Sequence, residues 1–262
     1  MKAVIPVAGY ATRLYPLTEH TAKALLPVGQ KEILAHFLDK LESYGSFDEV
    51  VLVSNDKFFT AFTKWANRQP YSFSLRVIND GTTSNENRLG AVGDFVLGLE
   101  ALGSHDDHVL ISAGDGMFED SFAGLFGLFT QANATVIATK KSSPEVCRRC
   151  GVAEIDEEQR LISFVEKPEH PPSDLVGIMT YVVHRDHVRF LHEAYRAWSR
   201  PDEMNAGEAV RYLVEQGAEI YAYTVEGAWF DVGTKEHLEE ARRHFSSNNK
   251  HYETNKNPKI FT

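Results

Sequence analysis

The sequence lacks a long apolar run, is poor in cysteine and has no excess of basic residues. No apolar stretch approaches the roughly 20 residues that a membrane-spanning helix needs. The first residues also lack the basic region, apolar segment and cleavage site of a secretory signal. The cysteines are confined to Cys147 and Cys150, a C-x-x-C pair that would form only half of a zinc site. We therefore expect a cytoplasmic chain with reduced thiols and no membrane partner.

The charge of the chain is negative overall. Its 262 residues include 27 lysines and arginines against 37 aspartates and glutamates, a formal net charge of -10. Such a chain repels nucleic acid in bulk, so no nucleic-acid partner is expected. A polyphosphate ligand would therefore need a local group of cations together with a divalent metal ion.

Apolar periodicity in the first half of the chain predicts alternating strands and helices. The expected strands cover residues 2–7, 49–54, 74–78, 108–112 and 134–139, and the expected helices cover 32–44, 57–67, 88–102 and 119–131. This alternation is typical of an α/β fold with a mainly parallel sheet and helices on both faces.

The regular alternation of strands and helices ends after residue 140. The second half has expected strands at 151–155, 161–165, 177–183 and 219–224, and expected helices at 186–198, 206–216 and 235–246. No linker separates the halves, so we expect a single domain over residues 1–245 with a mixed sheet. Within it, residues 1–140 and 141–245 form two parts, and residues 246–262 form a polar tail.

A small-residue loop follows the first expected strand. The apolar segment 4–7 leads directly into A-G-Y-A-T-R-L over residues 8–14, which contains Arg13, and Lys23 follows. Small residues let backbone N–H groups approach an anion, and the two cations add fixed positive charge. The loop matches neither the P-loop nor the G-x-G-x-x-G dinucleotide motif. It therefore predicts a polyphosphate site of another type.

Two aspartates are candidates for holding a metal ion. Asp115 follows the apolar segment 109–112, at the carboxyl end of an expected strand and between two glycines. Asp231 follows two aromatic residues, just ahead of the last expected helix. In open α/β sheets, ligands bind outside the carboxyl ends of the strands, and Mg²⁺ takes carboxylate and phosphate oxygens. If the fold brings both carboxylates together, they could hold the metal ion that a triphosphate requires.

An acid and a base lie side by side where another expected strand ends. Glu166 and Lys167 precede Pro168, and neighbouring strand residues face opposite ways, so a salt bridge between them is not expected. A glutamate can accept hydrogen bonds from vicinal hydroxyls, and a lysine meets a phosphate as a point charge. The pair therefore predicts contacts to a phosphorylated polyol.

Taken in order, these motifs resemble the sugar-1-phosphate nucleotidyltransferases, the thymidylyl- and uridylyltransferases of glucose 1-phosphate and their relatives. The matching pieces are A-G-x-A-T-R-L-x-P-L-T with a lysine and L-L-P-V after it, then G-D, E-K-P and W-F-D-V-G-T, over roughly residues 1–245. The resemblance implies a Rossmann-like nucleotidyltransferase fold and Mg²⁺ as cofactor. It also implies a nucleoside triphosphate (TTP, UTP or CTP) and a phosphorylated small-molecule acceptor as substrates, and it leaves a homo-oligomer open.

The same resemblance implies a role for each matching position. Arg13 would bind the β and γ phosphates, Lys23 both reacting phosphate groups, and Lys167 the acceptor phosphate. Asp115 and Asp231 would ligate Mg²⁺. The implied nucleotide-binding residues are Ala8, Gly9, Ala11, Thr12, Asn79, Arg88, Leu89 and Gly90, in the part over residues 1–140. The implied acceptor-binding residues are Gly151, Glu166, Lys167 and Met179, in the part over residues 141–245.

The sequence departs from the family pattern at several positions. Ala11 replaces the usual glycine of G-T-R, Ala22 replaces the usual proline before the lysine, and residues 82–88 differ from the usual base loop. Met179 lies where the family places a glycine beside the sugar, so its bulk would reshape the acceptor pocket. The nucleobase and the acceptor therefore stay open. So do two alternatives: a cytidylyltransferase acting on phosphocholine or a phosphonate, and a non-catalytic homologue that senses nucleotides.

Overall fold

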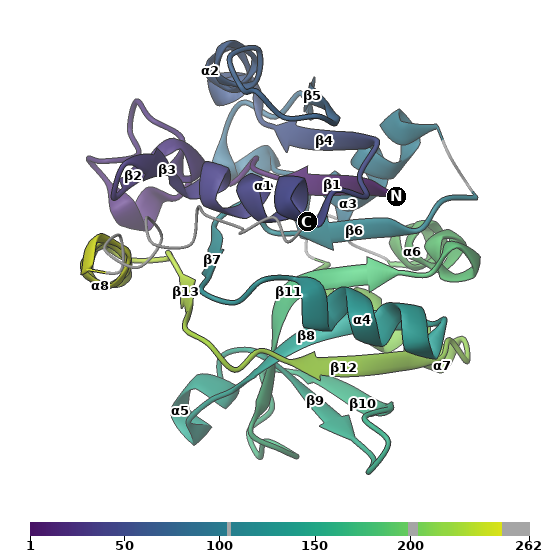
Figure 1. Ribbon diagram of the computed structural model, residues 1–262. Coiled ribbons are helices and arrows are strands. Elements are labelled where there is room, and N and C mark those ends of the chain that lie inside the picture. The colour runs from purple at the N-terminus through teal and green to yellow at the C-terminus, as the bar shows by residue number, and fades with distance from the viewer. Residues whose placement is uncertain (104–105, 199–203, 248–262) are drawn as a thin grey trace, which may run out of the picture.

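A mixed nine-stranded sheet, with helices on both faces, forms the centre of the molecule (Figure 1). The computed structural model describes residues 1–103, 106–198 and 204–247. The strands of the sheet are β1 (Lys2–Pro6), β4 (Glu49–Ser54), β5 (Ser74–Asn79), β6 (Val109–Ser112), β8 (Thr135–Lys141), β9 (Gly151–Ile155), β10 (Leu161–Glu166), β11 (Leu175–Val183) and β12 (Ile220–Thr224). The predicted Rossmann-like α/β architecture is confirmed.

The order of the strands joins the two halves of the chain in one sheet. The main path is β10-β9-β11-β6-β1-β4-β5, and β8 lies between β11 and β12. Strand β1 pairs in parallel with β4 and β6, so the carboxyl ends of these strands meet at one edge. Strand β11 runs antiparallel beside both β6 and β8, which accounts for the mixed sheet.

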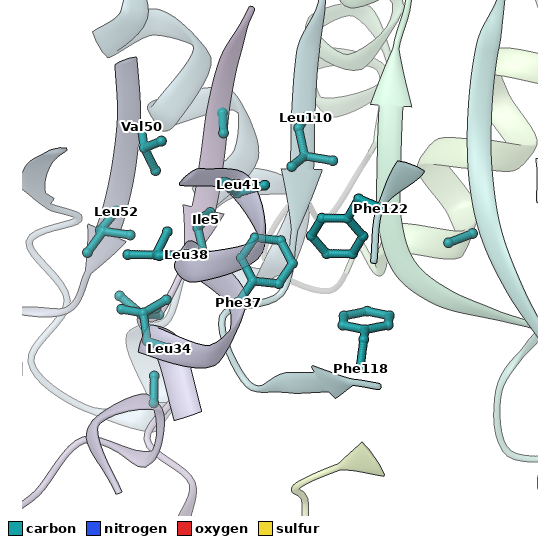
Figure 2. Close-up of a cluster of buried hydrophobic side chains, with 14 of the residues drawn as sticks. Ile5, Leu34, Phe37, Leu38, Leu41, Val50, Leu52, Leu110, Phe118 and Phe122 are labelled. Carbon is teal, nitrogen blue, oxygen red and sulfur yellow. The ribbon is translucent and has the colours of Figure 1, made fainter. Parts of the chain in front are cut away.

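Helices cover both faces because each presents an apolar stripe. One face carries α1 (Ile33–Tyr44), α2 (Asp56–Ala66) and α4 (Ala123–Ala132), and the other carries α3 (Gly90–Leu102), α6 (Arg185–Ala197) and α7 (Ala206–Glu215). Helix α1 buries Leu34, Phe37, Leu38 and Leu41 against the sheet (Figure 2). Each such side chain contributes about 1.5–3 kcal/mol on burial. The i, i+3 and i+4 spacing thus fixes which side of α1 faces the sheet.

Short elements outside the main sheet were not predicted. They are the ribbons β2 (Pro27–Val28) with β3 (Lys31–Glu32) and β7 (Gly116–Phe118) with β13 (Trp229–Asp231), and the short helix α5 (Pro144–Cys147). Because β7 occupies residues 116–118, helix α4 begins at Ala123 rather than at the expected residue 119. The β7–β13 ribbon ties the last part of the chain to the first.

The described part of the chain ends in a helix. Helix α8 (Lys235–Ser247) is the last described element, so residues 248–262 of the expected polar tail lie outside the described residues. Among the helices described, none combines the length and apolarity that crossing a bilayer would require.

Candidate active site

The small-residue loop turns sharply at the carboxyl end of β1. Ala11 adopts a left-handed conformation with φ of 47°, immediately ahead of a single 3-10 turn over Thr12–Leu14. The Thr18 hydroxyl donates to the Ala11 carbonyl at 2.8 Å, and the Leu14 amide donates to the same oxygen at 3.0 Å. A left-handed alanine is strained, so these contacts hold a conformation that glycine adopts more easily.

A cavity of about 270 Å³ opens where the loop meets the end of β6. Its wall includes Gly9, Tyr10, Arg13, Lys23, Asn85 and Asp115. Two of these residues are cations and one is an acid, and they come from segments far apart in the sequence. The cavity is therefore suited to an anionic ligand of limited size.

The two candidate metal-binding aspartates lie at the same end of the β7–β13 ribbon, Asp231 at the end of β13 and Asp115 directly before β7. In the β7–β13 ribbon, Asp231 is paired with Gly116, the residue that follows Asp115. Lys23 Nζ forms an ion pair with the Asp115 carboxylate. A Cβ atom at Gly233 would lie 3.7 Å from both Asp231 carboxylate oxygens and 3.8 Å from Arg13 Nη2, which places Arg13 beside Asp231. The pairing of β13 with β7 therefore brings the charged groups together.

The electrostatics of this group favour an added cation. The Asp231 side chain keeps contact with solvent, but the atoms packed around it raise the pKa of its carboxyl above the usual value. The negative charge of Asp115 raises that pKa further, against the opposing effect of Lys23. No cluster of three or more His, Cys, Asp or Glu side chains arranged for a metal ion occurs in the described part of the chain. Two carboxylates fit Mg²⁺ provided that phosphate oxygens and water supply the other ligands.

Glu166 and Lys167 lie at the end of β10, and they do form an ion pair. Lys167 Nζ lies 3.6 Å from Glu166 Oε1, contrary to our expectation. The reason is the backbone: Lys167 has φ of 47°, which breaks the alternation of side chains along the strand. The Lys167 amide donates to the Cys150 carbonyl at 3.0 Å, which holds this turn against the start of β9.

Glycines leave room for the Glu166 side chain. A Cβ atom on Gly151 would lie 3.0 Å from Glu166 Oε2, and one on Gly207 would lie 2.5 Å from it. Burial raises the pKa of Glu166, and the charge of Lys167 opposes this increase. Gly207, at the start of α7, was missed by sequence reasoning because an isolated glycine in a helical pattern carries no ligand signal.

The pKa of Cys150 responds to carboxylates of both predicted groups of site residues. Burial raises the pKa of its thiol, and the negative charges of Asp231 and Glu166 raise it further. The thiol is therefore within electrostatic range of both carboxylates. Both cysteines are free. The C-x-x-C spacing gave no indication that Cys150 would lie at the site.

Met179 supports the loop that contains Asp115. It lies at an irregularity in the β11–β8 pairing, with φ of 49°, and its carbonyl accepts a hydrogen bond from the Ala113 amide at 3.0 Å. Its side chain packs against the apolar cluster below α3, α6 and α7. A residue expected to shape the acceptor pocket thus also has a backbone role.

The predicted base loop makes most of its contacts within itself. The Ser84 amide donates to Asn87 Oδ1 at 2.9 Å, and Arg88 donates to the Asn85 carbonyl at 2.9 Å, whereas Asn79 donates to Asp56 of α2 at 2.8 Å. Leu89 and Gly90 begin α3, and the φ of 80° at Gly90 explains why the helix starts later than expected. In this loop Asn85, which the sequence did not single out, lines the cavity.

A buried acid lies one turn into α3. Asp94 is 7% exposed, and its Oδ1 atom has no hydrogen-bond partner among the described residues. Burial, together with the charge of Asp80, raises the pKa of Asp94 to about 8. At neutral pH this carboxyl is therefore mostly protonated. The sequence pattern could not reveal it, because Asp94 interrupts an otherwise apolar helix without belonging to a motif.

Known proteins resemble this chain over most of its length. The family model of nucleotidyl transferases matches residues 2–248. The chain is 29% identical over 256 residues to a glucose-1-phosphate thymidylyltransferase of Streptomyces antibioticus, covering 93% of this chain and 65% of that protein. It is 30% identical over 251 residues to the enzyme of that name from Neisseria gonorrhoeae, covering 92% of this chain and 81% of that protein.

The structural comparison agrees. A crystal structure of UDP-glucose pyrophosphorylase complexed with UDP-glucose has a TM-score of 0.79 and 19% identity, covering 94% of this chain and 98% of that one. At this identity the likeness shows the fold. The chain spans less than two thirds of the length of the Streptomyces relative, 65%. The family model, in contrast, covers nearly the whole chain. The protein therefore belongs to the nucleotidyl transferase family, which confirms the resemblance to the sugar-1-phosphate nucleotidyltransferases that its motifs indicated.

Proposed function

We propose that this protein transfers a nucleoside monophosphate from a nucleoside triphosphate to a sugar 1-phosphate and releases pyrophosphate. The observation that carries the proposal is the meeting of Arg13, Lys23, Asp115 and Asp231 beside one cavity at the carboxyl edge of the sheet. We call these residues the nucleotide side of the site. Gly151, Glu166 and Lys167, which lie together where β9 begins and β10 ends, form the acceptor side.

The nucleotide side would hold the triphosphate. Arg13 and Lys23 would contact its phosphate oxygens, and the backbone at Ala8, Gly9 and Ala11 would approach it closely. Lys23 would exchange its present partner, Asp115, for phosphate oxygens. Asp115 and Asp231 would hold Mg²⁺, which neutralises developing charge on the phosphates when bound. The residues of this side thus position the α-phosphorus and screen its charge.

The acceptor side would hold the second substrate. Lys167 would bind the acceptor phosphate, and Glu166 would accept hydrogen bonds from sugar hydroxyls. One phosphate oxygen of the acceptor would form a bond to the α-phosphorus as the bond from that phosphorus to the pyrophosphate oxygen breaks. A phosphate monoester is already ionised at neutral pH, so no general base is needed. Catalysis would then come from orientation and from charge neutralisation.

A substrate panel tests this function. TTP, UTP and CTP are each combined with Mg²⁺ and with several sugar 1-phosphates or phosphocholine, and pyrophosphate release is measured. We expect release with at least one sugar 1-phosphate. Activity confined to CTP with a choline-type acceptor would overturn the sugar assignment. Tight triphosphate binding without pyrophosphate release for any pair would overturn the enzymatic one.

A further inference from the structure

Side chains from other segments form hydrogen bonds with both the carbonyl and the amide groups of the segment between β12 and β13. We call residues 225–228 the strap. It leaves the sheet at the end of β12 and leads directly into β13, which contains Asp231 (Figure 1). The Val225 amide donates to the Thr139 carbonyl at 2.8 Å, so the strap starts in register with the end of β8. Its path therefore decides where β13 begins.

Lys140 binds the carbonyl side of the strap. Its Nζ donates to the Val225 carbonyl at 3.0 Å, the Glu226 carbonyl at 2.7 Å and the Gly227 carbonyl at 2.8 Å. An ammonium group has three donors, and here all of them are used on successive backbone oxygens of one short segment. A lysine at the solvent boundary usually keeps its head group in water, so this arrangement restrains the strap.

Acidic side chains bind the amide side. Asp120 Oδ2 accepts from the Gly227 amide at 2.7 Å and from the Glu226 amide at 3.1 Å. The Ala228 amide donates to Glu119 Oε2 at 3.0 Å, and its carbonyl accepts from the Glu119 amide at 2.8 Å. These acids directly follow β7, the strand that pairs with β13. The strap is thus tied to the strand that lies beside Asp115.

Asp120 and the strap can lie this close together because residue 227 is a glycine. A Cβ atom at this position would lie 2.2 Å from Asp120 Oδ1 and 2.8 Å from its Cγ, and the backbone here lies outside the left-handed region. Alanine would therefore force the Asp120 side chain to move, while the backbone at position 227 would not be strained.

We propose that Lys140 and Asp120 are positioning residues that hold the strap so that Asp231 stays beside Asp115. Because like charges repel, two neighbouring carboxylates without a metal ion need such a restraint in addition to the ion pair between Lys23 and Asp115. On its other side, the Asp231 carbonyl is held by the Gly233 amide at 2.8 Å and contacts His237 Nδ1 at 3.0 Å. The inference rests on the proposed function, since it assumes that the aspartates share a metal ion.

Mn²⁺ binding to the full chain, followed by electron paramagnetic resonance, tests the proposal without requiring turnover. Lys140→Met keeps the length of the side chain but removes its donors, and Gly227→Ala displaces Asp120. Loss of groups that orient metal ligands typically weakens metal affinity about 10- to 100-fold, and we expect this for both variants. Lys141→Met, at the exposed neighbouring position, should bind Mn²⁺ as the wild type does. Lys140→Arg should restore much of the affinity, because arginine also presents several donors.

Thermal unfolding and pyrophosphate release separate the outcomes. If Lys140→Met and Gly227→Ala lower the melting temperature but bind Mn²⁺ as tightly as the wild type, the strap contacts are structural only and the proposal is wrong. Should the wild type release pyrophosphate under those conditions, the proposed function would still stand. A wild type that neither binds Mn²⁺ nor releases pyrophosphate would overturn both.

Discussion

The charged residues on the nucleotide side come from distant segments, whereas those on the acceptor side are neighbours in the chain. Asp231 reaches Asp115 only because β13 pairs with β7, and Lys23 reaches Asp115 from the first loop. Glu166 and Lys167 instead meet through a left-handed backbone at Lys167, with glycines around the glutamate. The nucleotide side therefore depends on tertiary pairing, and the acceptor side depends on local backbone geometry.

The largest effect is expected from Asp115→Ala on the nucleotide side. Removing this carboxylate would take one of two candidate metal ligands and the ion-pair partner of Lys23. Loss of one such electrostatic contact typically lowers the rate about 10²- to 10³-fold, and we expect a fall in kcat on that scale. Pyrophosphate release measures it, with circular dichroism to check the fold. Glu157→Ala, in the exposed β9–β10 turn, is the matched control, and turnover near wild type in both would remove Asp115 from the mechanism.

Lys167→Ala should cause a smaller loss of activity than Asp115→Ala. The loss should concern the acceptor rather than the triphosphate. We expect about a 10²-fold decrease in kcat/KM for the acceptor, because the variant loses the charge that we propose binds the acceptor phosphate. The KM for the triphosphate should change little. Steady-state kinetics with each substrate varied in turn, and with Lys64→Ala on the outer side of α2 as control, measure this. An equal increase in both KM values would break the division into two sides.

Asp94, which is buried in α3, and Glu166, which is partly buried on the acceptor side, allow a comparison by pH. Burial raises the pKa of Asp94 to about 8 and also raises that of Glu166, but only Glu166 has a cation beside it. Folded Asp94 keeps its proton between about pH 4 and 8 while the unfolded chain releases it, so stability falls as the pH rises through this window. The slope is at most about 1.4 kcal/mol per pH unit.

Asp94→Asn removes this titration. From pH 5 to pH 8, its free energy of unfolding should therefore rise relative to the wild type by about 2 kcal/mol or more. Urea unfolding at both pH values measures the difference. Glu166→Gln should show a smaller change, since Lys167 opposes the effect of burial at that position. Parallel pH profiles for wild type and Asp94→Asn would mean that this carboxyl is ionised in the folded protein.

The sequence predicted the strands of the sheet and the helices that cover it because their apolar periodicity is strong, as in α1. It also located the charged loop, the aspartates and the Glu166–Lys167 pair, although the structure leaves their chemical roles as predictions. It did not predict the β7–β13 ribbon, since strands of three residues carry too little periodicity. Cys150 and Gly207 were missed for a related reason. Their place at the site follows from how separate segments pack, which no local pattern records.

The smallest expected effect, that of Ala11→Gly, tests whether the backbone is strained on the nucleotide side as well. Ala11 and Lys167 share a φ of 47°, a region that costs an alanine energy and a glycine almost none. Glycine also makes the unfolded chain more flexible, so the net gain in unfolding free energy should be only about 0.5–1 kcal/mol. Ala61→Gly, within helix α2, should instead lower it by about 1 kcal/mol. Urea unfolding distinguishes these opposite signs. A loss of stability in both variants would mean that the hydrogen bonds from Thr18 and Leu14 already remove the strain at Ala11, leaving the acceptor side alone in depending on a strained backbone.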